Sequence, residues 1–68
     1  MTASTEQLSP RQREVLRLLA DGMRARDIGA KLGLSEATVR NHIRGVLRRL
    51  ECHSQLQAVA RARERRLL

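Results

Sequence analysis

An apolar stripe between Gly33 and Leu50 constrains the fold of this chain more than any other feature. Its members recur at helical spacing and would share one face of a helix: Val39, Ile43, Val46, Leu47 and Leu50. Ser35, just before the stripe, suits the N-cap, and Glu36 would place a negative charge in the first turn, where the helix dipole favours it. The stretch therefore predicts one long helix that starts after Ser35 and buries one face.

The opposite face of this predicted helix is polar and basic. At about 100° per residue, it carries Ala37, Arg40, Asn41, Arg44 and Arg48. A helix about 22 Å long, at roughly 1.5 Å per residue, with such groups outward would fit the major groove of DNA. Because arginine can bind guanine and asparagine can bind adenine through paired hydrogen bonds, Arg40, Asn41 and Arg44 are candidates for base contacts. The alternative is an ordinary solvated face.

Composition limits the core and sets the surface charge. The chain has 68 residues, enough for one small domain, and it contains no Phe, Trp or Tyr, so Leu, Val, Ile and Ala must build the core. Lys and Arg number 14 against 7 Asp and Glu, a formal charge of +7, and Lys31 is the only lysine. An arginine excess favours polyanions, double-stranded DNA among them. The alternative is a surface that is merely soluble.

Several other classes of protein are disfavoured. A single cysteine, Cys52, forms no internal disulfide and suits a reducing cytoplasm. No apolar run approaches the roughly 20 residues that span a bilayer, so no membrane association is expected. Residues 1–7 are polar and are expected to be a disordered lead-in to a domain at 8–68.

The sequence also offers no chemistry for catalysis. It has no acid pair, no nucleophile–base set and no glycine-rich phosphate loop, so neither an enzyme nor a cofactor is expected. His42, Cys52 and His53 fall short of the roughly four ligands of a zinc site. Cys52 is expected to be a small core residue.

A capping box predicts the first helix. Ser9 would be the N-cap, Pro10 the first helical residue and Gln12 the third, which completes the box. The helix would end at Asp21–Gly22 and bury an inward stripe: Val15, Leu16 and Leu19. Leu8, just before the cap, is expected to pack on the core.

A short second helix, about Ala25 to Leu32, leads through Gly33–Leu34 into the long one. Two helices joined by such a short glycine-containing turn form a helix-turn-helix. Gly29 in the second helix costs up to about 1 kcal/mol relative to alanine, which indicates close approach of another helix, or else neutral drift. Gly45 is expected on the outward side of the long helix, either to let it approach the duplex or by drift.

Ser54 and Gln57 predict a second capping box and a fourth helix over about residues 55–64. One stripe would face the core: Ala58, Val59 and Ala62. A second, offset stripe is left over and hints at a partner helix: Leu56, Ala60 and Arg63. The basic tail is expected to be solvated: Arg61, Arg63, Arg65 and Arg66.

These motifs together resemble the LuxR-type helix-turn-helix domain, also called the GerE family. The matching pieces extend through nearly all of residues 8–68: Leu8–Arg11, Gly22, Asp27–Ile28, Leu32–Ser35, Thr38–His42, Arg49–Leu50 and Gln57–Ala60. The resemblance implies an all-α domain, with a tri-helical core and a C-terminal dimerisation helix. It implies a transcriptional regulator that binds inverted-repeat DNA as a homodimer. In this family the domain ends response regulators and autoinducer receptors or stands alone.

The resemblance also implies roles by position. Base contacts would come from Arg40, Asn41 and Arg44. Phosphate contacts would come from Arg26, Thr38 and Arg48, with two further candidates near them, Ser35 at the helix N-terminus and His42. The dimer interface would include Leu56 and Ala60, and Arg63 would extend it.

The chain departs from the family pattern at a few positions. Glu51–Cys52 replaces the usual Gly-Val, Gln55 the usual arginine, Gly29 the usual alanine and Ala25 the usual asparagine. The alternative resemblance is to sigma-factor region 4, which has a similar Arg-Gln-Arg-Glu-Val-Leu helix. That reading predicts a module that interacts with RNA polymerase and binds DNA as a monomer or non-specifically. His42 and the helix around Gln57 favour the LuxR type.

Overall fold

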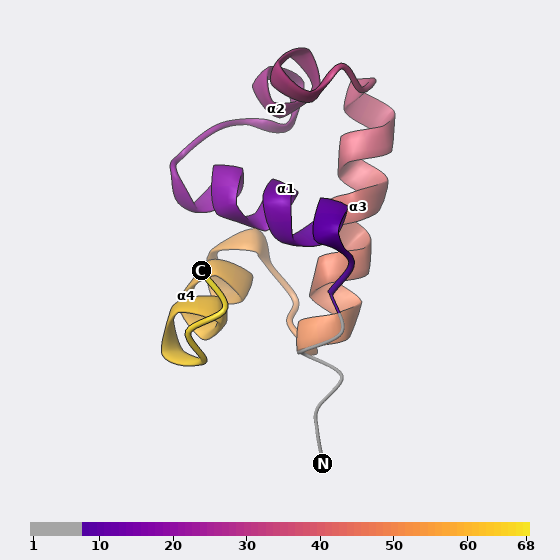
Figure 1. Ribbon diagram of the computed structural model, residues 1–68. Helices are drawn as coiled ribbons and strands as arrows, with labels where there is room; N and C mark the ends of the chain where they lie inside the picture. Colours follow the sequence, from indigo (N-terminus) through magenta and orange to yellow (C-terminus); the bar gives the residue numbers. More distant parts are fainter. Residues whose placement is uncertain (1–7) are drawn as a thin grey trace.

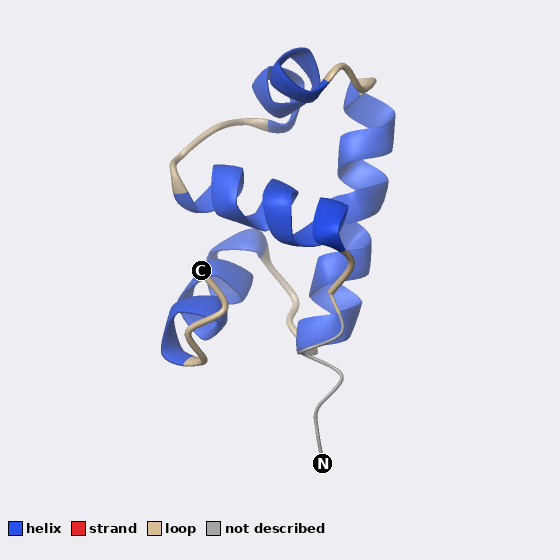
Figure 2. Cartoon of the chain, in the orientation of Figure 1, coloured by secondary structure: helices blue, strands red, loops and turns tan. Residues whose placement is uncertain are grey.

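The computed structural model describes residues 8–68, and the lead-in expected at 1–7 lies outside this range. Four helices make up this part of the chain (Figure 1): α1 Pro10–Ala20, α2 Ala25–Leu32, α3 Glu36–Leu50 and α4 Gln55–Glu64. The remaining described residues form turns and loops, with no strand among them (Figure 2). The all-α class and the bounds predicted for each helix are confirmed.

The longest helix, α3, is the element on which the others are assembled. It contacts all three other helices. In Figure 1, α1 crosses beside the middle of α3, α2 lies at the N-terminal end of α3, and α4 lies beyond α1 on the other side. This arrangement covers one face of α3 along its length and leaves the opposite face to solvent.

Two apolar clusters lie on either side of α1. One joins α1 to α2 and the first half of α3: Val15, Leu18, Ala25, Ile28, Val39 and Ile43. The other joins α1 to α4 and the second half of α3: Leu8, Leu16, Val46, Leu50, Cys52, Ala58 and Ala62. Leu47 packs against both clusters. The predictions that Leu8 and Cys52 are core residues are confirmed, whereas α1 buries Leu18 and leaves Leu19 half-buried.

The two predicted capping boxes differ in the structure. At α1 the box is closed: the Gln12 N–H donates to Ser9 Oγ, and the Ser9 N–H donates to Gln12 Oε1, both at 3.0 Å. At α4 the Gln57 N–H donates to Ser54 Oγ at 3.1 Å, but Gln57 Oε1 accepts from the N–H of His53 at 2.7 Å. The glutamine thus binds the residue before the cap, and the reciprocal bond of a capping box is absent here.

The two helical glycines are both tightly packed. A Cβ at Gly29 would lie 2.5 Å from the carbonyl oxygen of Leu34, so the close approach is that of the α2–α3 turn rather than of another helix. The prediction that Gly45 faces outward is wrong. Gly45 is buried, and a Cβ there would lie 2.5 Å from Gln12 Nε2, because α1 crosses α3 at this level and widens its covered face.

Candidate nucleic-acid interface

The face of α3 turned away from the core is polar, basic and open to solvent. The three residues predicted to read bases are all exposed and lie within two turns of α3: Arg40, Asn41 and Arg44. Arg48 is exposed one turn further on. Because the opposite face of α3 is fully packed, the helix is a rigid support for these side chains. The chain therefore presents two arginines and an amide on a ridge along one helix, and an α-helix is an element that a DNA major groove admits.

Two hydrogen bonds order this ridge. Arg40 Nη2 lies 2.5 Å from Glu36 Oε2, one turn earlier, and Arg44 Nη1 donates to Asn41 Oδ1 at 2.7 Å. About half of each side chain in the Arg40–Glu36 pair is exposed, and such pairs contribute only about 0–1 kcal/mol. Glu36, which we did not predict at the site from the sequence, therefore orients Arg40 through a weak, solvent-exposed contact.

The N-terminal turn of α3 presents hydroxyl groups. Ser35 Oγ accepts from the Thr38 N–H at 3.0 Å and donates to Thr38 Oγ1 at 2.9 Å. Ser35 is thus the N-cap that the sequence predicts, and its own hydrogen is used. The hydrogen of the Thr38 hydroxyl is the donor that the pair can still offer. The first N–H groups of a helix lack intrahelical acceptors and favour an anion such as phosphate.

Basic side chains also surround the N-terminus of α2. Arg26, predicted to contact phosphate, is exposed and shares a depression with two other arginines, Arg24 and Arg40. Arg24 was not predicted at the site. It is the N-cap residue of α2, and its side chain makes no capping hydrogen bond. The sequence did contain a signal for it: Arg24 stands two residues before Arg26, at the start of the helix that precedes the α2–α3 turn.

The other predicted phosphate ligands lie further along α3. His42 is half-buried and Arg48 is exposed. The structure therefore places Ser35 and Thr38 at the N-terminal end of α3, and it places Arg26 near Arg40 in the depression at the start of α2. Arg48 lies apart from them, toward the C-terminal end of α3.

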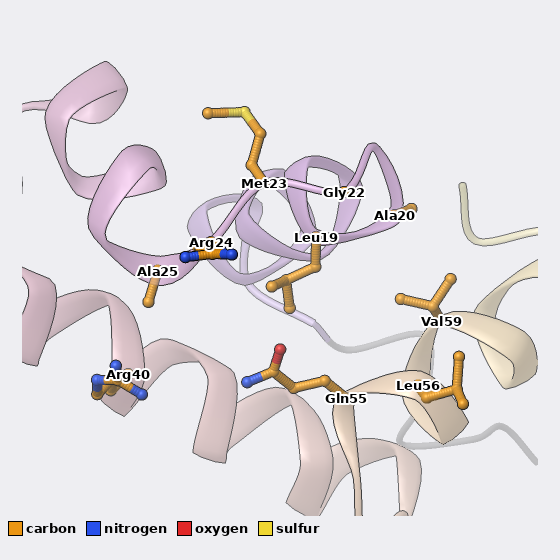
Figure 3. A pocket seen from close by; sticks show the side chains of 10 residues that line it. All are labelled: Leu19, Ala20, Gly22, Met23, Arg24, Ala25, Arg40, Gln55, Leu56 and Val59. Atoms are coloured by element: carbon orange, nitrogen blue, oxygen red, sulfur yellow. The ribbon is translucent and has the colours of Figure 1, made fainter.

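A second depression connects this face to α4. Figure 3 shows Arg24 and Arg40 at one end and Leu56 and Val59 at the other, with the end of α1 between them. Leu56 is 81% exposed, and Ala60 and Arg63 are exposed as well. The stripe predicted to be left over on α4 is thus uncovered in the single chain.

The described residues offer no cluster of metal ligands. Among residues 8–68, no three His, Cys, Asp or Glu side chains come together in a way that could hold a metal ion. Cys52 is buried and its Sγ donates to the carbonyl of Leu50 at 3.4 Å. Within the same range no helix has the length and apolar character needed to cross a membrane.

Comparison with protein-family models matches the chain to one family. Residues 6–62 match the model of the bacterial regulatory proteins of the luxR family. The chain belongs to the luxR family.

Relatives of this luxR-family chain are transcriptional regulators. It is 38% identical over 58 residues to the transcriptional regulatory protein DesR of Bacillus subtilis (strain 168), covering 85% of this chain and 29% of DesR. It is 31% identical over 61 residues to the nitrate/nitrite response regulator protein NarL of Escherichia coli (strain K12), covering 90% of this chain and 28% of NarL. The chain thus spans less than a third of the length of these relatives.

Two solved structures have the same fold. The response regulator ChrA of a heme-sensing two-component system superposes with a TM-score of 0.86 at 38% identity, over 90% of this chain and 30% of ChrA. The transcription factor GerE superposes with a TM-score of 0.84 at 34% identity, over 90% of this chain and 91% of GerE. The match to GerE covers nearly the whole of both chains.

The departure from the family pattern at Glu51 has a visible consequence in this luxR-family domain. Glu51 ends α3 with φ 57° and ψ 47°, the left-handed conformation that glycine adopts most easily. The turn is closed by backbone bonds from the Glu51 N–H to the Arg48 carbonyl at 3.2 Å and from the Cys52 N–H to the Leu47 carbonyl at 2.9 Å. The α3–α4 corner therefore forms without the usual glycine, although at a conformational cost.

The prediction that Arg61 is solvated is wrong. Arg61 is half-buried, and its Nη1 donates to the carbonyls of Leu50 and Glu51 at 2.6 and 2.9 Å. Helical spacing alone does not predict this contact, because the partners lie on a different helix and its cap.

Proposed function

We propose that this chain is the sequence-specific DNA-binding domain of a transcriptional regulator. In this proposal α3 enters the major groove as the recognition helix, and Arg40, Asn41 and Arg44 contact base edges. The observation that carries it is the exposed ridge of these three side chains on a helix whose other face is packed. Membership of the luxR family and the regulators among its relatives support the same conclusion.

The phosphate contacts in this proposal flank the base contacts. Arg26, in the first turn of α2, and Thr38, in the first turn of α3, would bind one stretch of backbone. Arg48, beyond Arg44 on α3, would bind another. Ser35 and His42 belong to the same set. Phosphate contacts fix the position of the helix and make affinity depend on salt, whereas base contacts give sequence preference.

We further propose that α4 pairs two copies of the chain on inverted-repeat DNA. Its support is the exposed stripe of Leu56, Ala60 and Arg63, with Leu56 the exposed large apolar side chain of the described residues. A two-fold dimer places two recognition helices on half-sites about one helical turn apart, or a similar distance, so the DNA site mirrors the symmetry of the protein.

Selection from a library of random DNA duplexes tests both parts. The chain would be mixed with the library at moderate salt and the bound fraction sequenced after several rounds. Enrichment of an inverted repeat is the expected result, and it would give the half-site spacing directly. A single asymmetric element would contradict the dimer but keep specific reading. Salt-sensitive binding without any enrichment would overturn base reading by α3 and leave only contacts to phosphate.

A further inference from the structure

The fourth helix is held against the domain by little apolar surface. The fully buried side chains of α4 are two alanines, Ala58 and Ala62, and Val59 is half-buried. The larger apolar side chains near it, Leu67 and Leu68, pack on the same cluster but lie beyond the end of the helix. An alanine buries one methyl group, and apolar stabilisation scales with the area removed from water. Small side chains also interdigitate little, and interdigitation is what fixes the rotation of one helix on another. Packing alone therefore specifies the orientation of α4 weakly.

Arg61 supplies a directional contact in its place. One guanidinium nitrogen, Nη1, donates to the carbonyl of Leu50 at 2.6 Å and to that of Glu51 at 2.9 Å. These are the last carbonyl of α3 and the carbonyl of its C-cap. The last carbonyls of a helix receive no hydrogen bond from a backbone N–H of the same helix. A cation at a helix C-terminus is also favoured by the helix dipole, and charged donors form the stronger hydrogen bonds.

The other arginine contacts of this region are weaker. Arg63 Nη2 reaches the carbonyl of Ala20 at the end of α1, and Arg13 Nη1 reaches that of Leu67, both at 3.4 Å. Arg63 is exposed, whereas Arg61 is half-buried. The contact of Arg61 is thus the shortest side-chain link between α4 and the recognition helix among the bonds described.

We propose that Arg61 is the positioning residue that fixes the orientation of α4 relative to α3, and that it thereby sets the half-site spacing which a dimer accepts. The second part rests on the proposed function, because it requires pairing through α4. In such a dimer, a rotation of α4 on its own domain moves the whole recognition helix of each copy. The two carbonyls at the end of α3 give Arg61 a fixed reference on that helix.

The experiment compares the parent chain with Arg61→Met, which keeps the apolar stem and removes the donors. Arg61→Lys, which keeps a charged donor, is the conservative variant, and Arg65→Met, at an exposed arginine of the tail, is the matched control. Residual dipolar couplings of the backbone amides would measure the orientation of each helix in the free chain. Binding to one half-site, and to inverted repeats with different spacers, would be measured in parallel.

In Arg61→Met we expect the couplings of α1, α2 and α3 to fit one orientation and those of α4 to depart from it. Affinity for a single half-site should stay within about twofold, while the preference for the best spacer over its neighbours should fall about tenfold, the size expected for loss of a hydrogen bond to a charged group. Arg61→Lys should retain much of the parent chain's α4 orientation and spacer preference. Arg65→Met should leave both the orientation and the preference unchanged.

An unchanged orientation of α4 in Arg61→Met would overturn the proposal, and so would an unchanged spacer preference. An equal loss on single half-sites and on repeats would mean that Arg61 acts only through general stability, which also overturns it. If the parent chain binds single half-sites only, the dimer of the proposed function fails, and with it the role in spacing. The couplings then still decide whether Arg61 orients α4.

Discussion

The carboxylate of Glu36 and the guanidinium of Arg40 form an ion pair at 2.5 Å on the face of α3 that we propose reads DNA. Glu36 lies in the first turn of α3, where its negative charge interacts favourably with the helix dipole and stabilises the helix. The same carboxylate pairs with a cation that, in the proposed function, binds DNA. The same side chain therefore has opposite effects on folding and on the proposed binding.

Replacement of this carboxylate should separate the two effects. We expect Glu36→Gln to raise DNA affinity by up to about fivefold, because a weak exposed pair no longer competes for Arg40 and a negative charge near phosphate is lost. We expect the free energy of unfolding to fall by about 0.3–1 kcal/mol. Fluorescence anisotropy at fixed salt and thermal melting measure the two quantities. Weaker binding by the variant would mean that Glu36 itself contacts the DNA.

Arg44 and Arg48, one turn apart on α3, should differ in what they contribute to binding. Arg44→Ala is expected to reduce discrimination at one base pair by about 1–3 kcal/mol. Arg48→Ala is expected to weaken binding to all sequences alike and to lower the slope of affinity against salt by about one. Titrations against the selected site and its single-base variants, at several salt concentrations, measure both. Equal losses on every sequence for both variants would remove Arg44 from the base-reading set.

The sequence predicted this fold well where the determining interactions are local. Helix ends depend on residues three positions apart, such as Ser9 with Gln12, and the apolar stripe of α3 depends on helical spacing alone. A rigid helix then sends most residues opposite the stripe to solvent, Gly45 excepted. The exposure of Arg40 and Arg44 followed from the positions of Val39 and Ile43.

The sequence failed where one element meets another. Gly45 is buried because α1 crosses α3 at that level. The spacing of residues within α3 does not predict where another helix crosses it. Leu18 is buried in place of Leu19 because α1 has clusters on two sides. Arg61 binds carbonyls at the end of another helix, and an arginine in a basic tail gives no sign of such a partner.

Because Glu51 adopts a left-handed conformation, replacing it with glycine should stabilise the domain. A residue with a Cβ pays a steric cost there that glycine avoids, and a carboxylate at a helix C-terminus opposes the dipole. We expect Glu51→Gly to raise the free energy of unfolding by about 0.5–1 kcal/mol, which is a rise in Tm of roughly 4–8 °C per kcal/mol for a domain of this size. Glu14→Gly, inside α1, is the control and should lose about 1 kcal/mol. A lower Tm for Glu51→Gly would contradict the cost assigned to this turn.

The two helical glycines should respond differently to the same substitution. At Gly29 a methyl group would meet the Leu34 carbonyl, which is backbone and cannot move aside, so Gly29→Ala should destabilise the domain by about 1–3 kcal/mol. At Gly45 it would meet Gln12 Nε2, the end of a flexible side chain. Gly45→Ala should therefore gain helix propensity, lose part of the α1 cap and change stability by less than about 0.5 kcal/mol. Denaturant unfolding of both variants measures this difference, and equal effects would refute the distinction.

Leu56 offers the sharpest test of the proposed dimer, because its side chain is 81% exposed in the single chain. Leu56→Asp should leave the Tm of the free chain nearly unchanged, since exposed substitutions usually alter stability by no more than about 0.5 kcal/mol. On an inverted repeat it should abolish cooperative binding, because an unpaired carboxylate would be buried between two copies of α4. A duplex with one half-site is the control and should bind both chains equally. Analytical ultracentrifugation on the inverted repeat measures the stoichiometry, and an unchanged sedimenting mass for the variant would move the interface away from this face of α4.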